Sequence, residues 1–337
     1  MRRPRLRDRD GAEVHLPCPR LSGPLRRQAL FWVNRLSFGD VARLLQEMSG
    51  AATLSEDGLW RLAQAEARCL DERQRQAIQD VAALPEPEYG AADLYQGDSP
   101  EFVVMTDAIG VKAQKPTRER AGETRRPKAQ KRHDTDVLIL PRKGGGERVV
   151  CEGLSGRWSL VEAARACLRR EWGGSPLSVV ALTDGAKTIR LDLAALFGAG
   201  VRVVLDWYHL SKRVYQQLSM AAHSMGEREG WERQVLAWLW RGDVAEARAF
   251  LAGLTGRNAK ALADLIGYLD KHAGEIIDYG RRQEAGKVIG SGRMEKCVDR
   301  VVGHRQKGKG MSWTQAGSRA LALLKVAELN AHHPLPA

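Results

Sequence analysis

The sequence predicts an α/β protein in which an all-α segment interrupts a mixed sheet and a helical region precedes it. Three observations support this prediction. Short β-branched runs follow one another in the middle of the chain, later runs alternate with helical patterns, and a long segment after the last run has helical periodicity alone. With 337 residues, the chain is long enough for one catalytic domain and one or two helical modules.

The N-terminal part is expected to be helical after an arginine- and proline-rich arm at 1–24. Helical patterns begin at Leu25, after Ser37 and after Ser55, and both serines can act as N-caps. Residues 25–84 are expected to form a DNA-binding region, because the pattern from Leu36 to Gln64 resembles a helix-turn-helix, although its connection is longer than is usual. An ordinary helical hairpin is the alternative interpretation.

The central part is expected to form a five-stranded sheet after a linker at 85–101, which is rich in turn-forming residues. The expected strands cover 102–105, 137–140, 148–151, 178–182 and 201–205. Helices at 159–171 and 187–197 separate the last three strands. Three successive strands followed by a helix, a strand, a helix and a strand are the order of a ribonuclease-H-like sheet, whose first part should span 102–211.

The rest of the chain is expected to be helical. Apolar residues keep a helical spacing from Tyr208 to about Tyr279, which predicts an all-helical insertion at 212–285. Glycines then interrupt the pattern, and the C-terminal helices at 286–330 should complete the sheet-containing core.

The charge of the chain favours a polyanionic partner. Lysine and arginine total 53 against 41 acidic residues, which gives a net charge of +12. Residues 1–36 hold nine arginines and three acids, and residues 115–132 hold eight basic residues and two acids. Double-stranded DNA is therefore the expected partner.

The cysteines and the apolar segments favour a cytoplasmic protein. The five cysteines are far apart and lack the spacing of a zinc site, so we expect reduced thiols. No stretch approaches the roughly 20 apolar residues that span a bilayer, and no apolar signal segment follows the basic start. Neither secretion nor membrane insertion is expected.

Three acidic residues are candidate metal ligands. Asp107 and Asp184 each end a β-branched run, and Glu295 opens a helix after a Gly-Ser-Gly break. Carboxylates on rigid elements that point to one place can hold two divalent cations for phosphoryl transfer. Each acid also suits a purely structural role: Asp107 a surface hairpin, Asp184 a helix N-cap, and Glu295 a solvated helical face.

Asp206 and His209 form a second candidate group. They lie three residues apart at the end of the last expected strand, so the first turn of a helix would put both on one side. Both residues are predicted to lie close to Asp107 and Asp184. The alternative is that Asp206 caps this helix and His209 packs beneath it.

Basic side chains in three places are candidate contacts to DNA phosphates, with a solvated loop as the alternative for the last place. They are Arg61 in the helical region, Arg125, Arg126 and Lys128 in the basic run, and His304, Arg305, Lys307 and Lys309 after the glutamate.

Five motifs occur in the order TDAIG, LTDGAKTIR, DWYH, GSGRMEK and RQKGKGMSW. This ordered set resembles bacterial insertion-sequence DDE transposases of the Mutator-like superfamily. The resemblance implies a ribonuclease-H-like core with a helical insertion. It further implies that Asp107, Asp184 and Glu295 are the catalytic triad and bind two Mg²⁺ ions, with Mn²⁺ as a substitute. Asp206 and His209 would be the accessory D-x-x-H motif.

The resemblance also implies an activity. Such an enzyme binds the terminal inverted repeats of an insertion sequence and performs Mg²⁺-dependent DNA cleavage and strand transfer. Because two element ends must be paired, a homodimer or higher oligomer on DNA is expected, associated with the bacterial nucleoid. Two alternatives stay open, a catalytically inactive DNA-binding protein derived from a transposase and a ribonuclease-H-like structure-specific nuclease.

Overall fold

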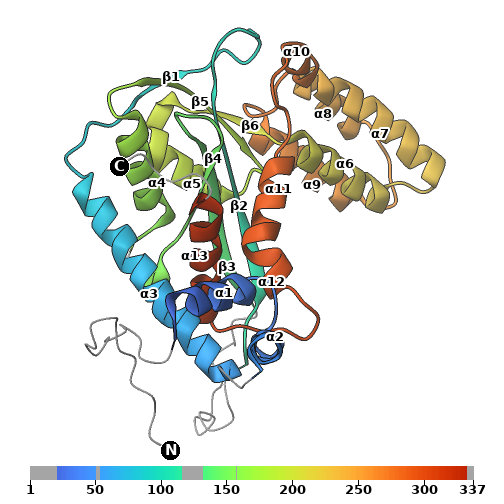
Figure 1. Cartoon of the computed structure of the whole chain (residues 1–337). Coiled ribbons are helices and arrows are strands. Elements are labelled where there is room, and N and C mark those ends of the chain that lie inside the picture. Colours follow the sequence, from blue (N-terminus) through green and yellow to red (C-terminus); the bar gives the residue numbers. More distant parts are fainter. Residues whose placement is uncertain (1–20, 51–53, 116–131, 157, 332–337) are drawn as a thin grey trace, which may run out of the picture.

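A computed structural model describes residues 21–50, 54–115, 132–156 and 158–331. Helices surround a twisted sheet, and a group of helices lies beside one end of that sheet (Figure 1). The α/β fold expected from the sequence is confirmed.

The described residues form one mixed sheet of six strands. They are β1 (Glu88–Ala91), β2 (Phe102–Lys112), β3 (Arg132–Pro141), β4 (Glu147–Cys151), β5 (Pro176–Thr183) and β6 (Arg202–Leu205). β5 runs parallel to β2, and β3 and β4 continue the sheet with antiparallel pairs. β1 and β6 pair in parallel with successive parts of the same edge of β5. This arrangement is consistent with a ribonuclease-H-like fold.

Three strand predictions differ from the structure. β1 lies within 85–101, which was expected to be a linker, because its four residues contain no β-branched side chain to reveal it. β2 continues to Lys112, and β3 already begins at Arg132. The antiparallel pairing of β2 and β3 extends as far as Lys112 and Arg132. Hydrogen bonds between the two strands therefore keep these polar residues in strand conformation.

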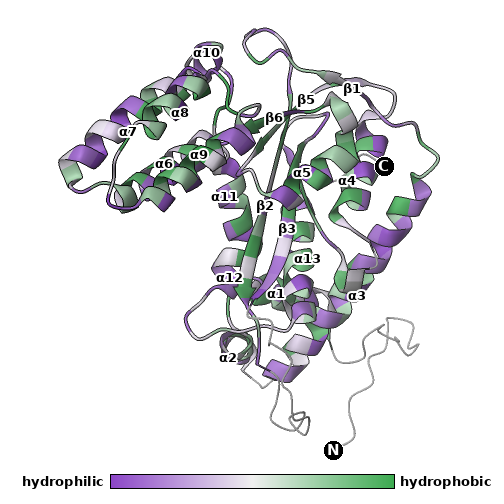
Figure 2. Ribbon diagram, turned by 180° about the vertical axis from the view of Figure 1, so that it is seen from behind, coloured by the Kyte–Doolittle hydropathy of each residue, from purple (hydrophilic) through white to green (hydrophobic). Residues whose placement is uncertain are grey.

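Helices cover both faces of the sheet. The residues of β5 from 179 to 183 are all buried, as are those of β3 from 137 to 140, which is typical of strands packed on two sides. The helices next to these strands are α4 (Leu160–Trp172), α5 (Lys187–Phe197), α11 (Gly292–Val298) and α13 (Gln315–Ala331). Figure 2 shows apolar residues gathered along the strands and polar residues on outward helix surfaces such as that of α3.

The N-terminal helices dock on this core. They are α1 (Gly23–Val33), α2 (Phe38–Ser49) and α3 (Glu56–Asp80). The predicted caps are confirmed, because Ser37 accepts a hydrogen bond from the Asp40 amide and Ser55 accepts one from Gly58. The second half of α3 packs against α13 and α4, and its buried Asp71 accepts a hydrogen bond from the Leu154 amide. Val41 and Leu45 form the buried face of α2, whereas Met48 is 67% exposed.

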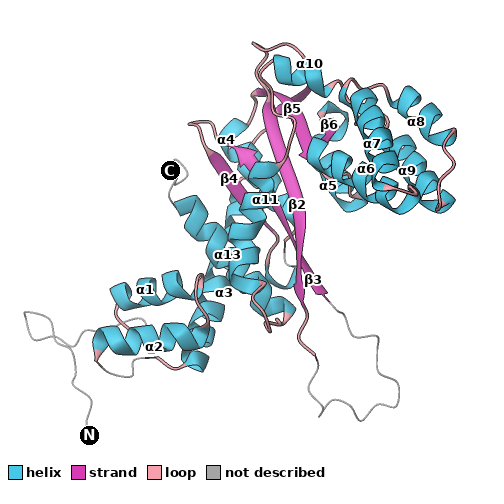
Figure 3. Ribbon diagram, turned by 90° about the vertical axis from the view of Figure 1, so that its right-hand side faces the viewer, coloured by secondary structure: helices cyan, strands magenta, loops and turns pink. Residues whose placement is uncertain are grey.

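All regular secondary structure between β6 and α11 is helical. Its helices are α6 (Trp207–Ala221), α7 (Met225–Trp240), α8 (Val244–Ala252), α9 (Ala259–His272) and α10 (Tyr279–Glu284). Figure 3 shows α6 to α9 beside the β6 end of the sheet, whereas α1 and α2 lie at the opposite end of the molecule. Fully buried Arg282 joins this segment to the residues before β2 through an ion pair with Glu101 at 2.8 Å.

The remaining short elements connect these helices. They are 3₁₀ turns at Leu154–Gly156 and Gly198–Gly200, a π-helical segment at Asp299–Gly303 and α12 (His304–Gln306). Within the described ranges, no helix combines the length and apolar character needed to cross a membrane.

Glu328 on α13 holds α1 against the core, and its charge should contribute to stability. Arg35 donates hydrogen bonds to both of its carboxylate oxygens, and Lys325 donates one at 3.1 Å. Burial alone would raise the pKa of Glu328, but these two cations outweigh burial and lower it from 4.5 to about 2.

Glu328→Gln should therefore lower the free energy of unfolding by about 1–2 kcal/mol at pH 7. The lowered pKa means that this stabilisation is complete above pH 4.5 and disappears as the pH falls toward 2. Urea unfolding of both proteins at pH 7 and at stepwise lower pH measures the difference. A difference that stays constant through acid would contradict the assignment.

Candidate functional site

Asp107 lies on β2, and Asp184 directly follows the neighbouring strand β5. In the parallel pair of β2 and β5, Met105 is opposite Leu182. Continuing this register by two residues brings Asp107 next to Asp184. Because register neighbours in adjacent strands point to the same face of a sheet, their carboxylates share one side. The sequence predicts Asp107 at the end of its strand. In the structure it lies in the middle of β2, at the point where the pairing with β5 ends.

The same register extends to Asp206. β6 pairs with β5 so that Leu205 is opposite Thr183, and the next position sets Asp206 beside Asp184. The Asp206 amide also donates to the Thr183 carbonyl at 2.8 Å. Asp184 and Asp206 thus directly follow the carboxyl ends of β5 and β6, and β5 pairs with the strand that carries Asp107.

Asp107 is half-buried and lies in a negative environment. Burial raises its pKa, and the charges of Asp184 and Glu295 raise it further. The Ala108 amide, which donates to Asp107 at 2.7 Å, and the nearby His209 act in the opposite direction. The carboxylates are therefore close enough for their charges to interact.

Asp184 begins a tight turn that leads into α5. Its Oδ1 accepts a hydrogen bond from the Ala186 amide at 2.8 Å. Ala186, and not Asp184, is the N-cap of α5, so the interpretation of Asp184 as a helix cap is wrong. Gly185 has a φ of +82°, and a β-carbon at this position would overlap the ring of His272 at the end of α9. The helical segment thus packs directly against the backbone that carries Asp184.

Asp206 is a buried hydrogen-bond acceptor for two segments. It caps α6 by accepting from the His209 amide at 2.8 Å, and its Oδ1 lies 3.1 Å from His209 Nδ1. Its Oδ2 accepts the amide hydrogen of Ser291, the N-cap of α11. Burial would raise the pKa of Asp206, but the hydrogen bonds from His209 and Ser291 lower it below its usual range.

His209 lies between this acceptor and the other two aspartates. The hydrogen bond to Asp206 raises the pKa of His209 in spite of partial burial, and the charges of Asp206, Asp184 and Asp107 raise it as well. The predicted role of Asp206 as a helix cap is confirmed. His209 does more than pack beneath the helix, because the charges of the nearby carboxylates act on its ring.

Glu295 lies on α11, one helical turn after Ser291. This helix packs on β2 and β3, which explains the electrostatic contact between Glu295 and Asp107. The Glu295 side chain is exposed and forms no hydrogen bond or ion pair with any other described residue. A π-helical segment follows at Asp299–Gly303, a distortion that is frequent at functional sites.

The carboxylates suit divalent cations by chemistry, but they are not gathered into a ligand set. Carboxylate oxygens are the ligands that Mg²⁺ and Mn²⁺ prefer, and the mutual repulsion at Asp107 is what a cation would relieve. Nevertheless, in the described ranges no group of three or more His, Cys, Asp or Glu side chains is placed to hold a metal ion. Side-chain rotation would have to accompany binding.

Arg305 is not a surface residue, in contrast to the prediction that it contacts DNA. It is 4% exposed and donates from Nε to the Val33 carbonyl at 2.7 Å. Its guanidinium lies 5.2 Å from the ring centroid of Phe38 and 5.1 Å from that of Trp313. Burial lowers the pKa of Arg305 to about 10. This side chain fastens α1 to the C-terminal region.

The other predicted DNA contacts divide into two groups. The exposed residues are Arg61, His304, Lys307 and Lys309. Arg61 is also paired with Asp57 at 2.7 Å within α3. The predicted contacts at Arg125, Arg126 and Lys128 lie outside the described residues.

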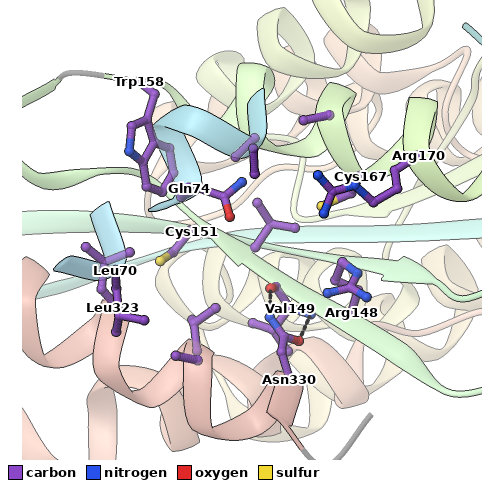
Figure 4. Close-up of a pocket in the computed structure, with 16 residues that line it drawn as sticks. Leu70, Gln74, Arg148, Val149, Cys151, Trp158, Cys167, Arg170, Leu323 and Asn330 are labelled. Carbon is purple, nitrogen blue, oxygen red and sulfur yellow. Dashed lines mark hydrogen bonds between the residues drawn. The ribbon is translucent and has the colours of Figure 1, made fainter. Parts of the chain in front are cut away.

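A cavity of about 130 Å³ lies away from the carboxylates, between α3, α4, α13 and the edge strand β4 (Figure 4). Asn330 there pairs with both backbone groups of Val149, at 3.0 and 2.8 Å, and so covers the open edge of the sheet. Buried Arg148 is paired with Glu171 at 2.7 Å. The lining contains none of the predicted site residues.

Sequence reasoning missed the residues that support the site. Ser291 holds Asp206, and His272 backs the turn at Gly185 while contacting Arg190 and Glu275. Ser291 with Asp206 and His272 with Arg190 are far apart in the chain, so no local sequence signature reveals these contacts. Only the Gly-Ser-Gly break around Ser291 drew attention to its position.

Comparison with known proteins yields little. No protein-family model matches the chain, and no curated protein matches it. Among solved structures, the chain is similar to one in the Drosophila P element transposase strand transfer complex, with 10% sequence identity, a TM-score of 0.39 and coverage of 94% of this chain and 93% of that chain. A likeness at this level does not establish a shared function.

Proposed function

We propose that the chain is a DNA transposase of the DDE type that cleaves and joins DNA with divalent cations. The observation that carries the proposal is that Asp184 and Glu295 both lie close enough to influence the pKa of Asp107, as expected when the β2–β5 register is continued by two residues. The strongly basic composition supports DNA as the substrate. The ordered sequence motifs supply the assignment to Mutator-like insertion-sequence enzymes.

Asp107, Asp184 and Glu295 would hold two Mg²⁺ ions, or Mn²⁺ in their place. When bound, such ions supply activation of the attacking oxygen and charge stabilisation of the leaving oxygen in an in-line displacement. The two aspartates come from adjacent strands and are therefore rigidly spaced. Glu295 comes from a separate helix, so its contribution depends on where α11 begins.

His209 and Asp206 would support the triad without binding metal. Both oxygens of Asp206 already accept hydrogen bonds from His209 and Ser291, so we assign it a positioning role. The raised pKa of His209 favours a positive charge beside Asp107 and Asp184. That charge would offset part of the carboxylate repulsion.

The decisive assay incubates the protein with labelled inverted-repeat DNA, a plasmid target and Mg²⁺. A joined product supports transposition, a cut product alone indicates a nuclease, and a shifted band with neither indicates a DNA-binding protein. The repeat sequence is taken from the DNA that flanks the gene.

Asp184→Asn and Glu295→Gln should each abolish cleavage and joining, with a loss of at least about 100-fold, because each removes a proposed metal ligand. Binding of the repeat DNA should persist. Gel assays with Mg²⁺ measure the products. Asp270→Asn, an exposed carboxylate on α9 that pairs with Arg248, is the matched control and should cleave normally. Wild-type cleavage by Asp184→Asn would refute its role.

Asp206→Asn should release the start of α11, because its amide group cannot accept hydrogen bonds from both His209 and Ser291. We expect a loss of about 1–3 kcal/mol in the free energy of unfolding. We also expect slower cleavage and faster hydrogen exchange in 292–298. Glu295→Gln should abolish cleavage without changing that exchange. Unchanged exchange in Asp206→Asn would contradict the positioning role.

Lys307→Ala combined with Lys309→Ala should reduce the salt dependence of DNA binding, because two exposed phosphate contacts are removed. The slope of log affinity against log salt should fall by about two. Arg305→Ala should instead lower stability by about 2–3 kcal/mol, because it leaves the Val33 carbonyl unpaired. Fluorescence anisotropy at several salt concentrations and urea unfolding measure these effects. An unchanged slope would exclude the two lysines as contacts.

A further inference from the structure

One side of α6 carries an exposed aromatic and basic stripe, formed by Tyr208, Lys212 and Tyr215. The tyrosines are 54% and 48% exposed. At 100° per residue, the three residues fall on one line along the helix. Buried positions of α6, such as Leu210 and Gln217, lie on the opposite side, so packing does not explain the stripe.

Cations accompany both rings. Lys212 Nζ lies 5.5 Å from the ring centroid of Tyr208, and the Arg228 guanidinium lies 4.7 Å from that of Tyr215. Arg228 is neutralised by ion pairs with Glu229 and Glu232. Lys212, by contrast, has no ion pair with a described residue, and α6 itself contains no acidic residue. The stripe is therefore positive as well as aromatic.

The stripe begins at the candidate site. Tyr208 is the neighbour of His209, and their rings meet edge to face at 5.7 Å. Asp206 caps the same helix two residues earlier. Tyr208 and Tyr215 are about 10 Å apart along the helix axis, which is about the length of three stacked bases at 3.4 Å each. A DNA strand held at the carboxylates would therefore lie close to Tyr208.

We propose, on the basis of the proposed function, that this stripe binds unpaired nucleotides of the DNA strand next to the reacting phosphate. Exposed aromatic rings interleaved with cations bind single strands, because every base offers a face for stacking and the cation reaches the phosphate. Paired bases are stacked within a duplex and cannot use the rings. The stripe therefore selects frayed or opened DNA ends.

The test measures binding alone, in EDTA, with a short single strand that contains 2-aminopurine and with the matching blunt duplex. Tyr208→Ala should weaken single-strand binding about tenfold and reduce the fluorescence quenching caused by stacking. Tyr208→Phe should restore both, and duplex binding should stay unchanged. Met220→Ala is the control, since Met220 is 46% exposed on the same helix but lies off the stripe.

Two results would overturn the proposal. In the first, Tyr208→Ala and Tyr215→Ala bind the single strand as tightly as the wild-type protein does. In the second, these variants lose as much affinity for the duplex as for the single strand. Cleavage is scored separately with Mg²⁺. A wild-type protein that never cuts would refute the transposase function and leave the stripe intact, whereas a protein that cuts normally without Tyr208-dependent stacking would refute only the stripe.

Discussion

The arrangement of the site depends on one buried carboxylate. Asp206 follows β6, caps α6 through His209 and accepts the amide hydrogen at the start of α11 through Ser291. One side chain thus joins the sheet and the start of the helical segment to the helix of Glu295, which is far away in sequence. Because all three meet at a group that is 1% exposed, breaking any of its hydrogen bonds leaves a buried charge unsatisfied.

The helical segment acts on the site as well as extending the molecule. His272 fills the space beside Gly185, and Arg190 and Glu275 surround that histidine, so the turn after Asp184 is held from outside the sheet. Arg282 and Lys287 fasten the end of the segment through Glu101. These contacts explain how the chain returns Glu295 to the aspartates after the helical segment between β6 and α11.

Local sequence patterns were reliable where local energetics decide the structure. The serine caps at Ser37 and Ser55 were predicted from side chains that bond to neighbouring amides, and the five apolar strands from their β-branched residues. Prediction failed where a distant partner decides. β1 forms because β5 offers an edge, and Arg305 is buried because Phe38 and Trp313 enclose its cation.

The sequence by itself determined the α/β class, the strand order and the three acids that merit attention, because periodicity and short motifs encode these features. Only the tertiary structure decided how the acids relate. Strand register brings Asp184 between Asp107 and Asp206, and the packing of α11 brings Glu295 within electrostatic reach of Asp107. Register and helix packing depend on contacts between distant residues, which no local pattern contains.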